Sequence, residues 1–223
     1  GHGDAVGCVS PRDVFDMPPC GNAIFFRPGG RATYGFGNGR RLVDLEEISA
    51  QLRARPPGHS LPQPFYTDAD FFDFDLAAIF GRNWLFVGFE VELSKPGDYL
   101  SLTIGHWPIL VMRDRDGTVR GFHNSCRHRG SLLCPPGAGH AARIVCPYHR
   151  WTYGLDGRLL AAGRMPDDFD KREHGLNPIN LEIVAGAILV CLADSPPPLD
   201  TMRRDLTPLL APQDFAHAKL AHQ

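Results

Sequence analysis

One stretch, CRHRGSLLCPPGAGHAARIVCPYHRWTYGLDGRL at residues 126–159, decides the fold and the chemistry of this chain. It holds two pairs of a cysteine and a histidine. Cys126 and His128 are separated by one residue, Cys146 and His149 by two, and seventeen residues lie between the pairs. Thiolate sulfur and imidazole nitrogen suit zinc, or iron in an iron–sulfur cluster. Two short loops brought together at their tips could present these four side chains to one metal site.

A single zinc ion is the first alternative, because zinc also accepts two cysteines and two histidines. Zinc fingers usually have two paired cysteines followed by two paired histidines. Here each pair mixes the two residue types. The order therefore favours an iron–sulfur cluster over a zinc-stabilised binding module, which stays open as the less favoured interpretation.

The pattern, continued as HRWTYGLDGRL, resembles the Rieske domain of Rieske-type non-haem iron oxygenases, the ring-hydroxylating oxygenase family. In detail it resembles the α subunits of the branch that acts on quaternary ammonium compounds, the betaine-type N-demethylases. The segment LAPQDFAHAKLAH at 210–222 is similar to the part that leads into their catalytic domain. Four further stretches carry the resemblance: LPQPFYTD at 61–68, IFGRNWLFVG at 79–88, KPGDY at 95–99 and FHNSCRHRG at 122–130.

The resemblance implies a Rieske 2Fe-2S cluster. Cys126 and Cys146 would bind one iron and His128 and His149 the other, with two sulfides bridging the irons. His149 would be the exit for electrons, and no residue of this chain is expected to be catalytic. Three neighbours are expected to surround the ligands: Arg129, Tyr148 and Trp151.

The resemblance also implies the role of the parent protein, an oxygenase α subunit. Electrons from an NAD(P)H-dependent reductase or a ferredoxin would pass through the cluster to a mononuclear Fe(II). That iron would activate O2 for hydroxylation or N-demethylation, in a homotrimer. Its two-histidine, one-carboxylate site does not occur in this sequence, so we expect it only in a catalytic domain absent from this chain. A standalone Rieske-type ferredoxin is the alternative function.

Respiratory Rieske proteins have residues that raise the reduction potential of the cluster, and this sequence has other residues at the matching positions. Those proteins have an extra disulfide where this chain has Ser131 and Tyr148, and a serine hydroxyl beside a sulfide where it has Trp151. Hydrogen bonds to sulfur raise the potential. We therefore expect a potential near the low end of the Rieske range, about −150 mV.

Arginines flank the predicted ligands. Arg150 follows His149 where the family commonly has glycine. Arg127, Arg129 and Arg150 fit either of two interpretations, solvated charge or the docking of an acidic redox partner through complementary charge.

Short strand-like runs separated by turn residues indicate an antiparallel β-sandwich or small barrel. With the resemblance, the fold class is mostly β: a Rieske-type antiparallel sandwich with a cluster-binding subdomain of two hairpin loops and short flanking helices. A helix is expected at 68–81, begun by a capping box of Thr67 and Asp70, and another at 199–210. The strands are expected at 84–92, 99–104, 107–113, 118–124, 142–148 and 183–192, with turns at 114–117 and 155–158.

Three segments are expected along the chain. Residues 1–57 match nothing in the family and read as an irregular extension and linker. Residues 58–195 would form the Rieske domain, and 196–223 a connector towards the catalytic domain.

The composition is that of an ordinary globular protein, with 43% hydrophobic and 22% charged residues. The net charge of −2 argues against nucleic-acid binding. No apolar run approaches the roughly 18 residues that span a bilayer, and no secretory leader is recognised. We therefore expect a cytoplasmic protein without a membrane partner, in which cysteines bind metal rather than form disulfides.

Overall fold

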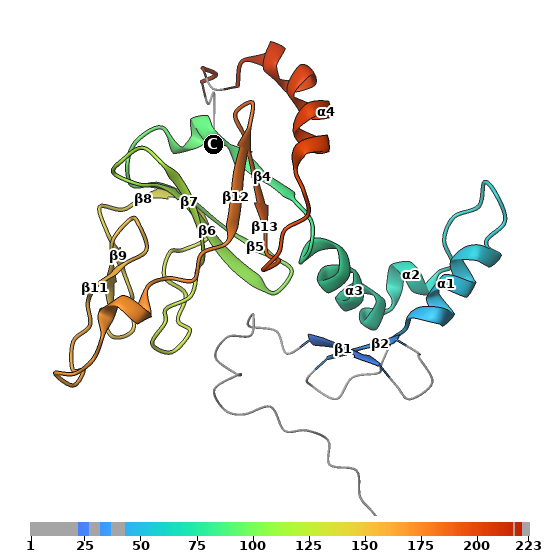
Figure 1. Ribbon diagram of the computed structural model, residues 1–223, viewed down its shortest axis with the longest axis horizontal. Coiled ribbons are helices and arrows are strands. Elements are labelled where there is room, and N and C mark those ends of the chain that lie inside the picture. The colour runs from blue at the N-terminus through green and yellow to red at the C-terminus, as the bar shows by residue number, and fades with distance from the viewer. Residues whose placement is uncertain (1–21, 27–31, 37–42, 216, 220–223) are drawn as a thin grey trace, which may run out of the picture. The chain divides into compact units, whose positions relative to one another are not determined.

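The computed structural model of the chain describes residues 22–26, 32–36, 43–215 and 217–219 (Figure 1). Side-chain positions are described from residue 46 onward. The chain divides into two compact units, Gly1–Ala77 and Ala78–Gln223. None of the described helices is both long and apolar enough to cross a membrane.

The first unit combines an antiparallel sheet with short helices. Ile48 and Ala77 are buried, and three phenylalanines pack against them. The elements of this unit are β1 (Asn22–Phe26), β2 (Ala32–Phe36), β3 (Val43–Asp44), α1 (Leu45–Ala54), α2 (Pro64–Thr67) and α3 (Ala69–Asp75). Residues up to 57 were expected to be irregular, and helix α1 corrects that expectation.

The helix predicted at 68–81 is present as α3 followed by a π-helical segment, Leu76–Phe80. Its cap differs from the prediction. The Asp68 carboxylate accepts hydrogen bonds from the backbone N–H groups of Asp70 and Phe71, at 2.8 and 3.4 Å. Thr67 already belongs to α2, where its hydroxyl donates to a backbone carbonyl one turn earlier. The extended backbone of Asp68 is the conformation that an N-cap needs.

The second unit is built from three antiparallel sheets. Their strand orders are β7-β6-β5-β8, β12-β13-β4 and β11-β10-β9. The mostly β fold and the antiparallel sandwich are confirmed, and the alternative of a small barrel is wrong. The strands are β4 (Leu85–Phe89), β5 (Asp98–Ile104), β6 (Trp107–Arg113), β7 (Val119–His123), β8 (Gly137–His140), β9 (Ile144–Val145), β10 (Thr152–Tyr153), β11 (Leu159–Ala161), β12 (Asn180–Val184) and β13 (Ala187–Cys191).

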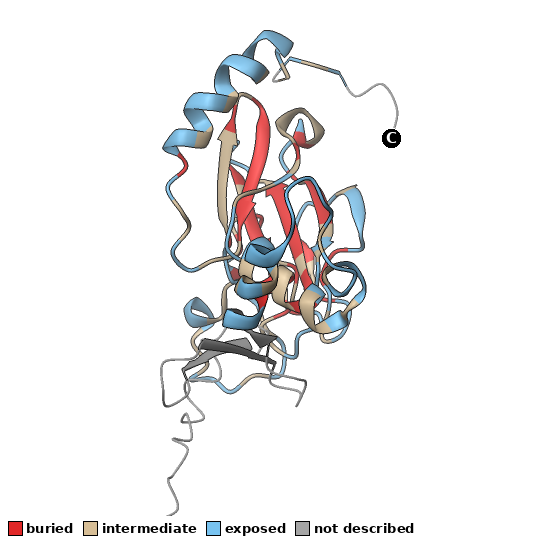
Figure 2. Ribbon diagram, turned by 90° about the vertical axis from the view of Figure 1, so that its right-hand side faces the viewer, coloured by how far each residue is buried: buried red, intermediate tan, exposed pale blue. Residues whose placement is uncertain are grey.

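Strand β6 is the centre of this unit because both of its faces are buried. Ile109 and Val111 point into the core shared with β13, where they meet Ile188. Leu110 and Met112 point into a second core, which also contains the predicted cysteine ligands. This double burial explains why β6 reads as a continuous apolar run rather than an alternating one. Figure 2 shows the buried strands in the middle of the unit.

Strand β13 is likewise buried on both faces. Its second face, with Leu189, is covered by helix α4 (Asp200–Leu210), which packs through Met202 and Leu206. The helix predicted at 199–210 is therefore confirmed. Figure 2 shows that the other side of α4 is exposed.

Three predicted strands are shorter or divided. The run at 84–92 contributes only β4, because Glu90–Leu93 form a short 3-10 helix. The run at 183–192 was expected to be one strand, but the chain turns at Ala185 and Gly186 and pairs β12 with β13. Both turn residues have positive φ, 48° and 84°, as a two-residue hairpin turn requires. The run at 142–148 contributes only β9, because Cys146 already begins a loop.

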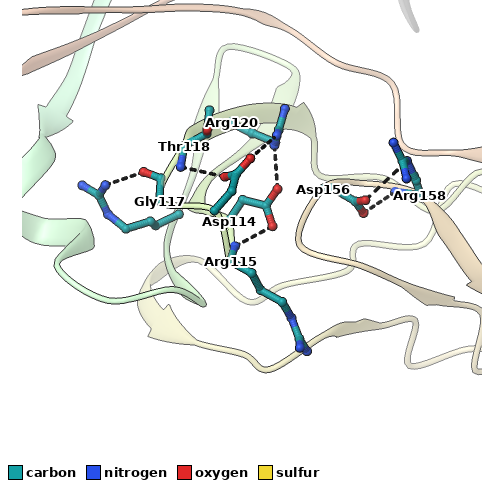
Figure 3. Close-up of polar contacts among 9 residues, drawn as sticks. Asp114, Arg115, Gly117, Thr118, Arg120, Asp156 and Arg158 are labelled. Atoms are coloured by element: carbon teal, nitrogen blue, oxygen red, sulfur yellow. Dashed lines mark hydrogen bonds and ion pairs between the residues drawn. The ribbon is translucent and has the colours of Figure 1, made fainter.

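The two predicted turns are present, and Figure 3 shows their polar contacts. In the turn at 114–117, Arg120 bridges the carboxylates of Asp114 and Asp116 at 2.8 and 3.0 Å. In the turn at 155–158, Gly157 has φ 82° and lies against the ring of Phe122 on β7. This contact joins the small sheet β11-β10-β9 to the sandwich.

Substitution of Gly157 should show how much that contact matters. Gly157→Ala should lower the free energy of unfolding by about 2–4 kcal/mol. About 1–2 kcal/mol reflects the left-handed backbone. The rest is overpacking, because a Cβ would lie 2.5 Å from the Phe122 ring. Gly117→Ala is the matched control, with φ 87° and open space around the added methyl group. Urea unfolding curves measure both, and equal losses would show that the contact contributes nothing.

Candidate metal centre

The first predicted pair lies in the loop between β7 and β8. The Cys126 N–H donates to the carbonyl of Ser131 at 2.9 Å, and the Gly130 N–H donates back to the carbonyl of Cys126 at 2.9 Å. These two bonds close the loop into a tight turn with His128 at its tip. Gly130 has φ 69°, a left-handed conformation that glycine adopts at low cost.

The second pair lies between β9 and β10 in a loop of the same design. The Cys146 N–H donates to the carbonyl of Trp151 at 2.8 Å, and the Arg150 N–H donates to the carbonyl of Cys146 at 3.1 Å. Arg150 stands where Gly130 stands in the first loop, with φ 62°. Here the left-handed position is held by a residue with a long side chain, which costs strain that glycine avoids.

The structure brings the four predicted ligands together. The Cys126 and Cys146 thiols are buried within hydrogen-bonding reach of each other. The imidazole rings of His128 and His149 lie with centroids 4.6 Å apart. Both histidines bury a ring nitrogen, Nδ1, that has no hydrogen-bond partner. A buried polar atom without a partner is rare and points to a ligand that the protein part alone does not supply.

The surroundings of the two sulfur atoms differ. Burial raises the pKa of the Cys126 thiol. Burial also acts to raise the pKa of Cys146, but the backbone N–H groups of His149 and Tyr148 donate to its sulfur, and the pKa falls below its ordinary value. The backbone N–H of His128 likewise donates to the sulfur of Cys126, so both loops supply donors that favour a thiolate, the form that binds metal.

The arrangement fits a two-iron cluster better than a single ion. Across the described residues, no three His, Cys, Asp or Glu side chains are placed to hold one metal ion. A structural zinc site needs four ligands around one ion. A Rieske cluster needs only two protein ligands on each iron, which agrees with one pair of sulfur atoms and one pair of imidazoles.

Tyr153 was not predicted as a site residue, yet it touches the first loop directly. Its hydroxyl oxygen accepts from the Arg127 N–H at 3.1 Å and lies 3.4 Å from the sulfur of Cys126. Because the oxygen already accepts, the hydroxyl proton is free for the sulfur. Burial, and then the contact with Cys126, raises the pKa of Tyr153, so the hydroxyl keeps its proton.

Asn124 is a second residue that sequence reasoning missed. It is fully buried, and its side-chain amide donates to the Ser101 hydroxyl and the Cys134 carbonyl, both at 2.8 Å. Its side-chain oxygen accepts from the N–H groups of Leu133 and Cys134. The amide therefore ties the first ligand loop to strand β5, and no local pattern could have revealed this long-range role.

Aromatic rings line both histidines. Trp151 is buried and stacks on His128, with centroids 4.9 Å apart and planes 11° from parallel. Tyr148 is exposed and lies 3.8 Å from the ring of His149. Of the three predicted neighbours, Tyr148 and Trp151 thus contact the ligands. Phe169 packs behind Trp151, a contact between distant segments that the sequence did not predict.

Positive charge gathers around His149. Burial, and then the charges of His128, Arg129 and Arg164, lowers the pKa of His149. Arg129 is the third predicted neighbour. Arg164 comes from the segment after β11, so only the fold brings it to the ligands.

Comparison with known proteins identifies this region. Residues 83–170 match the Rieske [2Fe-2S] domain family. The glycine betaine monooxygenase oxygenase subunit of Chromohalobacter salexigens is 48% identical over 171 residues, covering 76% of this chain and 38% of that protein. Its counterpart from Pseudomonas aeruginosa strain UCBPP-PA14 is 47% identical over 173 residues, covering 77% of this chain and 40% of that protein. This chain belongs to the Rieske oxygenase family.

Solved structures agree with this family. The quaternary ammonium Rieske monooxygenase CntA, in complex with gamma-butyrobetaine, has a TM-score of 0.60 at 33% identity. The match covers 68% of this chain and 43% of CntA. Naphthalene 1,2-dioxygenase from Rhodococcus sp. has a TM-score of 0.66 at 30% identity, covering 73% of this chain and 38% of that one. The predicted resemblance to Rieske oxygenase α subunits of the betaine-like branch is confirmed. The chain spans about two fifths of the length of the relatives it matches.

Removal of the Tyr153 hydroxyl should lower the reduction potential of the loaded Rieske domain. A hydrogen bond to sulfur favours the reduced, more negative cluster. A net hydrogen-bond energy of about 0.5–1.5 kcal/mol corresponds to about 20–60 mV for one electron. Redox titration of Tyr153→Phe measures the shift. Tyr99→Phe, a buried tyrosine of the same core, is the control, and an equal shift there would argue against the contact with Cys126.

The two loops also allow strain at the left-handed position to be tested in both directions, by removing a side chain in one loop and adding one in the other. Arg150→Gly should raise the free energy of unfolding by up to about 1 kcal/mol, because glycine has no Cβ to strain the left-handed backbone. The greater freedom of glycine in the unfolded chain limits this gain. Gly130→Ala should lower the free energy by about 1 kcal/mol. Urea unfolding measures both variants, and a destabilised Arg150→Gly would show that the position is not strained.

Proposed function

We propose that Cys126 and Cys146 bind one iron of the Rieske cluster and that Nδ1 of His128 and of His149 binds the other. The observation that carries this assignment is the pair of buried, unpartnered imidazole nitrogens beside two buried, neighbouring thiols. Neutral imidazoles in place of two thiolates make such a cluster less negative than an all-cysteine one.

The bound cluster supplies one-electron transfer, and the surrounding residues direct it. Trp151, buried against His128, keeps water from that side. His128 and His149 are both half-buried, but the ring that lies against His149 is that of the exposed Tyr148. We therefore assign the exit for electrons to His149, the ligand whose neighbouring ring is exposed rather than buried.

The parent protein that we propose is an oxygenase α subunit. Two relatives are named glycine betaine monooxygenase oxygenase subunits, and a solved relative holds gamma-butyrobetaine. These names favour a quaternary ammonium substrate and N-demethylation. A catalytic domain with a mononuclear iron would receive the electrons, in a homotrimer, and an NAD(P)H-dependent reductase or a ferredoxin would supply them. The expected location stays the cytoplasm.

We keep the three segments predicted from the sequence as part of this proposal. Residues 58–195 would form the Rieske domain, and residues 1–57 would form an N-terminal extension and linker. Residues 196–223, which include helix α4, would lead towards the catalytic domain.

Reconstitution with iron and sulfide tests the ligand assignment. The chain should bind about two irons and two acid-labile sulfides, turn red-brown and lose colour on reduction. Cys126→Ser and Cys146→Ser should each lose most of the iron. Cys134→Ser and Cys191→Ser are matched controls at buried cysteines and should keep it. Burial raises the pKa of Cys134 to about 11, so this thiol stays protonated. A colourless chain that binds one zinc, or a Cys134→Ser variant that loses iron, would contradict the proposal.

A further inference from the structure

Five buried side-chain nitrogen atoms of the described residues have no hydrogen-bond partner, and four of them belong to the two ligand loops. Such atoms are rare in proteins, and each one calls for an explanation. The proposed cluster accounts for two, because Nδ1 of His128 and of His149 would bind iron. The other three are Nδ1 of His123, Nε of Arg127 and Nε1 of Trp151. Of these three residues only Trp151 is buried as a whole, with 2% of its surface exposed.

The Trp151 ring lies directly against a proposed ligand. It stacks on His128, with centroids 4.9 Å apart and planes 11° from parallel, and it belongs to the core that contains both proposed cysteine ligands. Phe169 and His174 meet the indole at steep angles, with centroids 5.5 and 6.0 Å away. The ligand ring and these aromatic neighbours thus hold the indole in one position.

The indole nitrogen of Trp151 can only donate a hydrogen bond. Its N–H lies in the plane of the ring, so it points past the edge of the stacked imidazole rather than into its face. Neither proposed cysteine ligand is its acceptor, because Nε1 has no partner among the described residues. Both cysteine sulfurs instead receive backbone N–H groups of their own loops. Among the acceptors of the proposed site, this leaves the two inorganic sulfides.

We propose that the Trp151 indole N–H donates a hydrogen bond to a bridging sulfide of the Rieske cluster and so raises its reduction potential. The inference rests on the proposed function, since it requires the cluster that the four ligands would hold. Reduction adds one negative charge, and a donor aimed at sulfur stabilises the more negative form. Trp151 would then tune the potential of the cluster as well as shield it from water.

The first test needs no variant. The 223-residue chain is labelled with nitrogen-15 at the indole nitrogen of its three tryptophans, reconstituted with iron and sulfide, and reduced, because the reduced cluster is paramagnetic. Pulsed electron paramagnetic resonance should detect an isotropic coupling of one indole nitrogen to the cluster, since spin density reaches that nitrogen only through a hydrogen bond. A reduced cluster without this coupling would overturn the proposal.

The variant Trp151→Phe assigns the donor, because phenylalanine keeps a ring against His128 and removes the N–H. The isotropic coupling should be lost. Reduction should become about three- to tenfold less favourable, the effect of one net hydrogen bond. A tenfold change corresponds to about 59 mV for one electron, so the midpoint potential should fall by about 30–60 mV. An unchanged potential in a variant that keeps its cluster would contradict the proposal.

Two controls separate the hydrogen bond from packing. Trp84→Phe removes an indole N–H that donates to the carbonyl of Pro197 at 2.8 Å. Phe169→Leu loosens the packing against Trp151 without removing a donor. Both controls should shift the midpoint potential by less than Trp151→Phe does. An equal fall in either control would assign the shift to packing and overturn the hydrogen bond.

Failure of this inference is distinguishable from failure of the proposed function. A chain that assembles the 2Fe-2S cluster but shows no indole coupling would overturn only the hydrogen bond from Trp151. A chain that forms no iron–sulfur cluster would contradict the proposed function itself, and this inference with it.

Discussion

The structure depends on one constraint: two short loops must hold buried ligand atoms together without using those atoms for hydrogen bonds of their own. Backbone bonds meet this requirement. In each loop the cysteine N–H and carbonyl are paired across the turn, Cys126 with Ser131 and Gly130, and Cys146 with Trp151 and Arg150. The ligand side chains are therefore not needed to close the loops, and Nδ1 of both histidines has no hydrogen-bond partner within the protein.

The loops need a rigid support, and the sandwich provides it through strand β6. One face of β6 packs in the core between the two larger sheets, and the other packs in the core that contains Cys126 and Cys146. Asn124 adds a polar connection, because its amide links the first loop to Ser101 on β5. Stability of the sandwich and placement of the ligands are thus properties of the same strands. Since a preformed site binds metal without ordering the chain first, this support favours cluster assembly.

The sequence predicted what local pattern and resemblance can carry: the ligand pairs, most strands of the sandwich and the C-terminal helix. It could not show where one apolar run divides. Ala185 looked like the interior of a strand, because alanine gives no sign of a left-handed turn. Tyr153, Asn124 and Arg164 were missed for another reason. Their roles arise from contacts between segments distant in the chain, and no spacing rule applies to such contacts.

The comparison between Gly130 and Arg150 shows how one loop design serves two purposes. Both residues close the turn behind a cysteine ligand in the same left-handed conformation. In the first loop glycine meets the steric demand and nothing more. In the second loop the same demand is met at the cost of strain, and the exposed charge of Arg150 directly follows His149 in the chain. The second loop thus gives up some stability for a charge at the surface beside a proposed ligand, the kind of place where strained residues gather.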